Sequence, residues 1–128
     1  FTKHKTVTEE TVIDAFEHTF GFIKKLLAQY DIKEPAYLNM VVTNGLFLIG
    51  PRYVTDPNTE AVTLYHSEGS RYVVEDGITR MEAPKDDDQA VLVVSEKLSD
   101  DDNWTMIPQN HFVIVESSLN VKIRPIKA

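Results

Sequence analysis

The sequence predicts an α+β fold in which one long helix precedes an antiparallel sheet. Apolar residues recur at three- and four-residue intervals between positions 12 and 30, which is the period of an amphipathic helix. From residue 35 onward, short apolar segments recur at intervals of about 8–12 residues and are separated by turn-forming residues. A helical segment followed by a series of strands is typical of α+β proteins.

Composition and charge limit the classes of protein that the chain can represent. Its 128 residues, 42% of them hydrophobic, are sufficient for one compact domain, and we assign residues 1–128 to a single domain. The net charge is −7 and the basic residues are scattered, which argues against nucleic acid or an anionic membrane as a partner. No apolar segment approaches the roughly 20 residues of a membrane span. No signal peptide is recognisable, so we expect a cytoplasmic location.

The helix is expected to span residues 8–30. Apolar residues follow the helical period along it: Val12, Ile13, Phe16, Phe20, Ile23, Leu26, Leu27 and Tyr30. Thr6 and Glu9 have the spacing of a capping box, in which the hydroxyl accepts from a free backbone N–H and the carboxylate reaches back. We therefore expect Thr6 to cap the helix.

Residues 37–43 are predicted to form the first strand. They are largely apolar on both faces, which favours a strand in the interior of a sheet. Asn44 and Gly45 follow, and this pair indicates a two-residue type I′ turn, because both central residues of that turn need a positive φ. Residues 46–49 are then expected to return antiparallel and to end at Gly50 and Pro51.

Six more strands are expected further along the chain, at residues 61–66, 71–74, 78–82, 89–95, 111–116 and 121–125. The acidic or proline-bearing segments 56–60, 83–88 and 99–103 are expected to be loops. A single helix covers only one face of a sheet, and the other face needs another layer. We therefore expect apolar strand surface to stay exposed unless further protein covers it.

Two segments resemble the C-terminal half of class II glutamine amidotransferases. The first, residues 38–53, begins LNMVVTNG and ends GPRY. The second, residues 93–108, begins VVSEKL and ends WTMIP. The resemblance is greatest to the small glutaminase-type members, among them a fungal subunit that takes part in glutathione degradation. Family members more often have Asp where this chain has Asn44.

The resemblance implies part of an N-terminal-nucleophile hydrolase fold, with one long helix and the antiparallel strands of an αββα sandwich. It implies that the complete protein hydrolyses glutamine or a γ-glutamyl amide through an N-terminal cysteine, whose α-amine is the general base. The sequence has no cysteine, and the family's oxyanion-hole and substrate-clamp residues belong to the N-terminal half of the domain. We therefore assign no catalytic residue and no cofactor to this chain, interpret it as scaffold, and expect it to be inactive alone.

The resemblance also names the partners to expect. These are the N-terminal half of the domain or a partner subunit, together with a small-molecule glutamine or γ-glutamyl substrate. Homo-oligomerisation, in which a second copy covers the exposed strands, is a further alternative.

Ser95, Glu96 and Arg52 are the candidate substrate-binding residues. As a functional residue, Glu96 would face the glutamine pocket or orient a loop of the other half. The alternative is that Ser95 and Glu96 end a strand and satisfy backbone donors in the following turn. Arg52 is expected to pair with Glu96 or with a carboxylate of the other half, and such pairs are more often structural than ligand contacts.

Other polar residues favour structural interpretations. His66 and Ser67 are adjacent, but neighbouring strand residues point to opposite faces, so we interpret His66 as a surface histidine. The aspartates at 86–88 and 100–102 lack the glycine and downstream glutamate of an EF-hand loop, and the four histidines lack zinc spacing. No metal site is therefore assigned. Trp104 is interpreted as a packing anchor for its loop.

A non-enzymatic role fits the same residues. An α+β module that binds a protein partner, or a regulatory paralogue without its nucleophile, would also lack catalytic groups. The gene upstream of Phe1 distinguishes these alternatives, because the enzyme needs a cysteine directly after its starting methionine.

Overall fold

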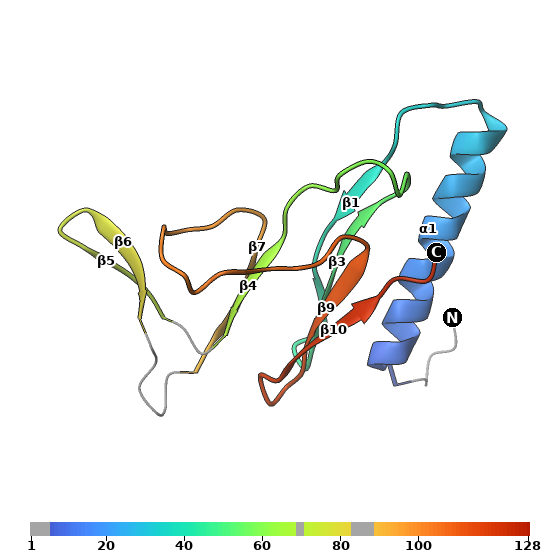
Figure 1. The fold of residues 1–128 in the computed structure, drawn as a ribbon. Helices are drawn as coiled ribbons and strands as arrows, with labels where there is room; N and C mark the ends of the chain where they lie inside the picture. The colour runs from blue at the N-terminus through green and yellow to red at the C-terminus, as the bar shows by residue number, and fades with distance from the viewer. Residues whose placement is uncertain (1–5, 69–70, 83–88) are drawn as a thin grey trace.

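The computed structural model describes residues 6–68, 71–82 and 89–128 and has three layers (Figure 1). α1 (Glu9–Gln29) packs on one face of an antiparallel sheet, here called the first sheet, and a second sheet lies on the opposite face. The strands of the first sheet follow the order β1-β3-β9-β10, with β2 also paired to β3: β1 (Tyr37–Asn39), β2 (Val42–Thr43), β3 (Leu48–Val54), β9 (His111–Val115) and β10 (Val121–Pro125).

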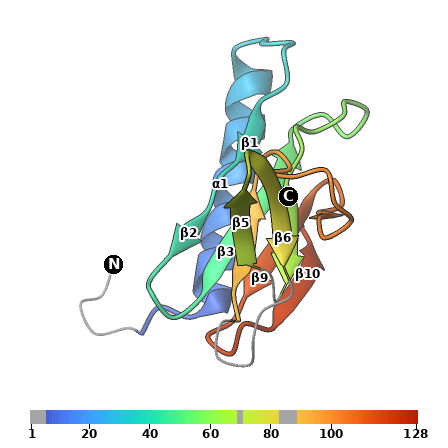
Figure 2. The same ribbon diagram turned by 90° about the vertical axis from the view of Figure 1, so that its left-hand side faces the viewer.

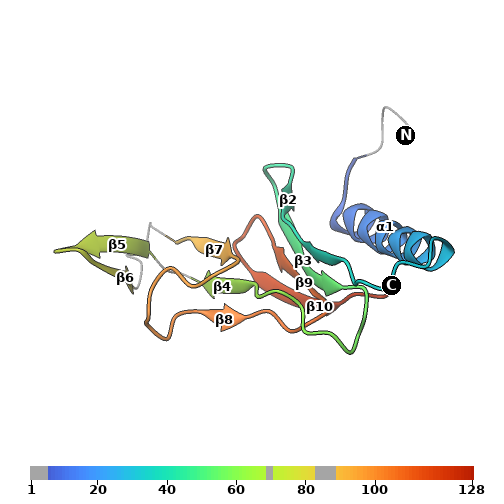
Figure 3. The ribbon, with the colours of Figure 1, turned by 90° about the horizontal axis from the view of Figure 1, so that it is seen from above.

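The second sheet is smaller and has the order β7-β4-β8. Its strands are β7 (Val91–Val94), β4 (Tyr65–Glu68) and β8 (Thr105–Met106), while β5 (Arg71–Glu75) and β6 (Ile78–Glu82) form a separate two-stranded sheet. Figure 3 shows from above that the second sheet lies on the side of β9 and β10 away from α1. One helix with antiparallel sheets confirms the predicted α+β class.

The helix begins one residue later than predicted, and its N-cap lies two residues later than predicted. The hydroxyl of Thr8, not Thr6, accepts a hydrogen bond from the backbone N–H of Thr11 at 3.2 Å. Glu9 does not reach back to a capping residue, because its carboxylate bonds Lys122 on β10 at 3.1 Å. The predicted C-terminal end is confirmed, since the helix stops at Gln29 and the next turn closes through Asp31 in the left-handed region (φ 53°).

The predicted strand 37–43 is present as β1 and β2, which share one register against β3. Its interruption at residues 40–41 lies opposite Gly50 and Pro51, and a proline has no N–H to donate to the ladder. The close approach of the strands favours glycine at position 50, because a Cβ on it would stand 3.1 Å from the carbonyl oxygen of Met40. The expected interior position is wrong: the strand borders the first sheet (Figure 2).

The two-residue turn predicted at Asn44 and Gly45 is wrong, and a turn of that kind occurs in the β5–β6 hairpin instead. Thr43 pairs with Leu48, which leaves a four-residue loop, and only Gly45 of the Asn44–Gly45 pair has a positive φ (88°). The Asn44 carboxamide oxygen instead accepts from two backbone N–H groups of the loop. The two-residue turn with both φ values positive is at Asp76 and Gly77, which the sequence analysis did not assign (φ 52° and 74°).

Several of the other predictions are confirmed, with local shifts. Strands lie at 71–75, 78–82, 111–115 and 121–125, and the segments 56–60 and 99–103 are turns and bends. β4 begins at Tyr65 rather than Ala61, and β8 was not predicted. The loop expected at residues 83–88 lies outside the described residues.

Two apolar clusters hold the layers together. The cluster between α1 and the first sheet contains Ile13, Phe16, Phe20, Ile49, Tyr53, Phe112 and Ile114. Its centre is the stacked pair Phe20 and Tyr53, whose ring centroids are 4.5 Å apart. The cluster between the two sheets is smaller and contains Leu64, Ile107, Val113 and Val115.

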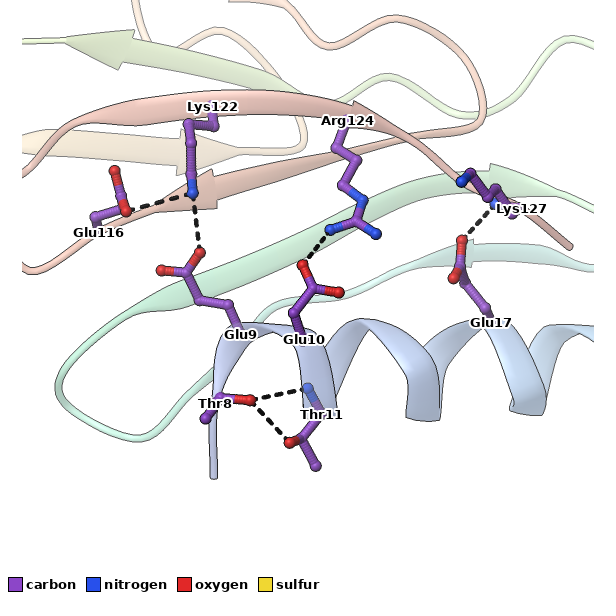
Figure 4. A network of polar contacts seen from close by, with 9 residues as sticks. All are labelled: Thr8, Glu9, Glu10, Thr11, Glu17, Glu116, Lys122, Arg124 and Lys127. Carbon is purple, nitrogen blue, oxygen red and sulfur yellow. Dashed lines mark hydrogen bonds and ion pairs between the residues drawn. The ribbon is translucent and has the colours of Figure 1, made fainter. Parts of the chain in front are cut away.

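Ion pairs fasten one flank of α1 to β10 (Figure 4). Lys122 binds both Glu9 and Glu116, at 3.1 and 3.3 Å, and Arg124 binds Glu10. The hydrogen bond from Arg124 lowers the pKa of the Glu10 carboxyl. All of these groups are solvent-exposed or partly so, and each pair therefore contributes little to stability.

Candidate functional site

A row of polar side chains crosses the face of the first sheet that meets the second sheet. Arg52 on β3 is directly paired with Asn39 on β1 and with His111 on β9. Directly opposed residues of an antiparallel pair project to the same face. Leu38 and Tyr53, one position along their strands, belong to the α1 cluster, so Asn39 and Arg52 lie on the opposite side.

The guanidinium of Arg52 is buried and donates to three backbone carbonyls. Its Nε, Nη1 and Nη2 atoms donate to the carbonyl oxygens of Val62, Ile107 and Ala61, each at 2.9 Å. The side chain is 4% exposed. Hydrogen bonds to a charged group contribute about 1.5–3 kcal/mol each, so Arg52 strongly holds the segment entering β4 and the segment leaving β8.

Two amides reinforce this attachment. The Nδ2 of Asn39 donates to the carbonyls of Val62 and Thr63, both at 3.1 Å. Gln109 accepts from the N–H of Ala61 at 2.9 Å through Oε1 and donates to the carbonyl of Thr59 through Nε2 at 2.8 Å. Side chains thus hold residues 59–63, which include the first half of the predicted strand 61–66, and this explains why β4 starts only at Tyr65.

Ser95 and Glu96 occupy the turn after β7, and both are exposed. The carbonyl of Ser95 accepts a hydrogen bond from the hydroxyl of Thr63 at 2.9 Å, which ties this turn to the segment that Arg52 holds. Among the described residues, neither side chain bonds a backbone donor, so the capping interpretation is wrong. Both side chains are free to meet a ligand or another segment.

The structure brings the three predicted site residues together only indirectly. Within residues 6–68, 71–82 and 89–128, no ion pair joins Arg52 to Glu96, because each guanidinium nitrogen already donates to a carbonyl. The expected pair between them is therefore wrong. Arg52 supports residues 61–62, Thr63 follows them, and Thr63 holds Ser95. Contact of any of the three with a substrate stays a prediction.

His66 is buried, and its interpretation as a surface histidine is wrong. It lies on β4, the central strand of the second sheet, and is 8% exposed. Burial lowers the pKa of the imidazole, and Glu68, 4.0 Å away, opposes this shift. Among the described residues, Nδ1 of His66 and Oγ of Ser67 find no hydrogen-bond partner. Because the two side chains project to opposite faces, they do not form a serine–histidine pair.

Hydrogen bonds within the loop at 99–103 hold the Asp101 carboxylate in place. Asp101 accepts from the hydroxyl of Ser99 at 2.6 Å and from the backbone and side-chain nitrogens of Asn103. Trp104 is buried and donates from Nε1 to Ser99 at 3.0 Å, which confirms its role as a packing anchor. In the part of the chain that the structure describes, no cluster of three or more His, Cys, Asp or Glu is arranged to hold a metal ion.

Sequence reasoning missed Asn39 and Gln109 as members of this network. Asn39 had a recognisable signal, since it is the one amide in an otherwise apolar strand at 37–42. Gln109 had no recognisable signal in the sequence, because its hydrogen-bond partners lie about fifty positions earlier.

A comparison with curated proteins found a relative in Saccharomyces cerevisiae that is named probable glutamine amidotransferase DUG3. The two sequences are 32% identical over 95 residues, which cover 73% of this chain and 26% of the yeast protein. No protein-family model matches the chain. The chain thus spans about a quarter of the length of this relative, and the similarity supports a glutamine amidotransferase-like relationship.

Proposed function

We propose that the chain is the scaffold part of a class II glutamine amidotransferase domain with the N-terminal-nucleophile hydrolase fold. The complete protein would hydrolyse glutamine or a γ-glutamyl amide through an N-terminal cysteine outside this chain. The observation that carries the proposal is the 95-residue similarity to the yeast protein. A cytoplasmic location goes with this proposal; within the described residues, no helix is both long and apolar enough to cross a membrane.

The layer order supports the proposed fold. Helix, first sheet and second sheet follow one another as three of the four layers of an αββα sandwich (Figure 1). Both sheets are antiparallel throughout.

The chemistry proposed for the complete protein is acyl transfer through a thiol. A thiolate attacks the side-chain carbonyl of glutamine, ammonia leaves, and water hydrolyses the thioester. This chain has no cysteine, and its buried Ser67 faces away from His66. The chain's contribution is therefore to hold β4, β8 and the Ser95–Glu96 turn in place through Arg52 and Thr63. Ser95 and Glu96 are the residues that we propose to border the substrate.

A second candidate function is a non-enzymatic module that binds a protein partner. One observation favours it: apolar side chains on the border strand of the first sheet are about 40% exposed, among them Met40, Val41 and Val42. Exposed apolar surface of this kind marks an interaction site.

Glutamate release from glutamine tests the proposal. We expect no activity from the 128-residue chain, activity from the full-length gene product, and none after its first cysteine is changed to serine. Activity of the chain alone would refute the scaffold role. A full-length product that is folded but inactive would favour the protein-binding module.

A further inference from the structure

α1 covers only part of the first sheet. Leu38 on β1 packs against the α1 cluster, and alternation places Met40 and Val42 on the same face of the border strand. Between these residues and the flank of α1 lies an open apolar groove with a volume of about 360 Å³. The groove is lined chiefly by Thr11, Ala15, Thr19 and Ile23 of α1 and by Met40 and Val42.

The strand beside the groove has an open edge. β1 and β2 pair with β3 on one side, and within the described residues no strand pairs with their other side (Figure 2). Residues 37–43 contain no charged residue and no proline. Proteins usually protect sheet edges with charged residues, prolines or bulges. An edge without these features is suited to pairing with another strand.

The two flanks of α1 differ in charge. Glu9, Glu10 and Glu17 bind partners on or beside β10, whereas the groove-lining residues of the opposite flank carry no charge. Thr11, Ala15 and Thr19 are small and four residues apart, so they form one row along the helix. A row of small side chains allows a second helix to lie alongside at an axial distance of about 8–10 Å.

We propose that the groove and the adjoining edge are one docking surface for a helix and a strand from the remaining part of the amidotransferase polypeptide. The helix lies beside α1 over Met40 and Val42, and the strand extends the first sheet at β1 and β2. This inference rests on the proposed function. The similarity covers 26% of the yeast relative, so most of such a polypeptide lies outside the aligned segment and is the source of the covering unit.

Two neighbouring substitutions on α1 test the proposal. Thr19 lines the groove and its hydroxyl bonds only the Ala15 carbonyl of its own helix, whereas His18 is exposed and is not part of the groove lining. Thr19→Glu and His18→Glu each add a negative charge and each replace a weaker helix former. Only Thr19→Glu would place that charge under a docked helix.

The melting temperatures of the two variants of the full-length product show whether a helix docks over Thr19. We expect Thr19→Glu to lower the melting temperature by roughly 5 °C or more, and His18→Glu to change it by no more than about 2 °C. In the 128-residue chain both variants should melt like the parent. Equal melting temperatures of the two full-length variants would overturn the proposal. So would a dimer of the parent chain that Thr19→Glu dissociates, because a second copy would then be the occupant.

Hydrogen exchange gives a second readout. The amides of residues 37–43 should exchange more slowly in the full-length product than in the 128-residue chain, and equal rates would contradict strand pairing at this edge. Neither measurement uses glutamine. Docking without hydrolysis would therefore keep this inference and refute the proposed function, and hydrolysis with equal melting temperatures would do the reverse.

Discussion

The two faces of the first sheet are held by different kinds of interaction. Against α1, the sheet buries large apolar side chains, and its polar contacts are exposed ion pairs at the border (Figure 4). Against the second sheet, the apolar cluster is smaller, and the buried guanidinium of Arg52 makes three hydrogen bonds to carbonyls.

This difference shows that the second sheet is positioned by directed bonds. Apolar contacts tolerate small shifts, whereas three hydrogen bonds donated by one planar guanidinium fix distance and direction. The turn at Ser95 and Glu96 is tied to the segment held in this way by the hydrogen bond from Thr63 to the Ser95 carbonyl. We therefore expect the stability of the helix interface to depend mainly on buried apolar area. The stability of the second sheet should depend on Arg52 and, through the buried His66 of β4, on pH.

The largest effect is expected at the helix interface. Phe20→Ala should lower the free energy of unfolding by about 3–5 kcal/mol, because it removes a buried ring and leaves a cavity beside Tyr53. Urea denaturation measures this change. Phe22→Ala is the matched control, since Phe22 is 56% exposed, and its effect should be within about 0.5 kcal/mol. Equal effects would mean that α1 packs through a different face.

The next effect is expected at the inter-sheet interface. Arg52→Met keeps an unbranched apolar stem but removes the guanidinium, which leaves three carbonyls without their donor, and should lower the free energy of unfolding by about 2–3 kcal/mol. Amides of β4 and β8 should exchange faster, while those of α1 change less. Arg124→Met makes the same substitution at an exposed ion pair and should have little effect. An Arg52→Met variant as stable as Arg124→Met would contradict the role given to the guanidinium.

A smaller, pH-dependent effect is expected from His66. Burial lowers its pKa in the folded state, so the unfolded chain takes up the proton first as the pH falls below about 6.5. Stability is therefore fully present above pH 6.5 and is lost between that value and the lower folded pKa. The urea midpoint should fall over this range and should fall less in His66→Gln. An NMR titration that places the imidazole pKa above 6.5 would refute the sign.

The smallest effect is expected from the border ion pairs. Glu10→Gln should change the melting temperature by no more than about 1 °C at neutral pH, because Glu10 is solvent-exposed and Arg124 is partly exposed. The lowered pKa of Glu10 places any contribution above pH 4.5, and that contribution should disappear as the pH falls through the folded pKa. A large loss of stability at neutral pH would show that the exposed pairs, and not the apolar cluster, hold the helix.

The sequence predicted the helix well, because a helix is encoded by the spacing of residues that are close together in the chain. The helix was placed within one residue at each end, because the 3–4 spacing of Ile13, Phe16 and Phe20 is a local property. The predicted capping residue was wrong, because Thr6 has the capping-box spacing to Glu9 whereas the hydroxyl that accepts from the first turn is that of Thr8.

The candidate site was harder to predict, because its bonds join distant segments. Arg52 was singled out, but its partner Ile107 is 55 positions away and offers only a backbone carbonyl, which every residue has. His66 was placed at the surface because the sequence did not show that β4 is the central strand of its sheet. The interior position predicted for residues 37–43 is also wrong for this chain, and the proposed docking surface would account for it.

The most direct test of the scaffold role is to trap the nucleophile. The full-length product is incubated with a glutamine analogue that carries an electrophilic carbon in place of the side-chain amide, and the labelled peptide is identified by mass spectrometry. The account predicts one adduct, on a cysteine outside these 128 residues. An adduct on a residue within the chain, such as Ser67 or Ser95, would contradict it.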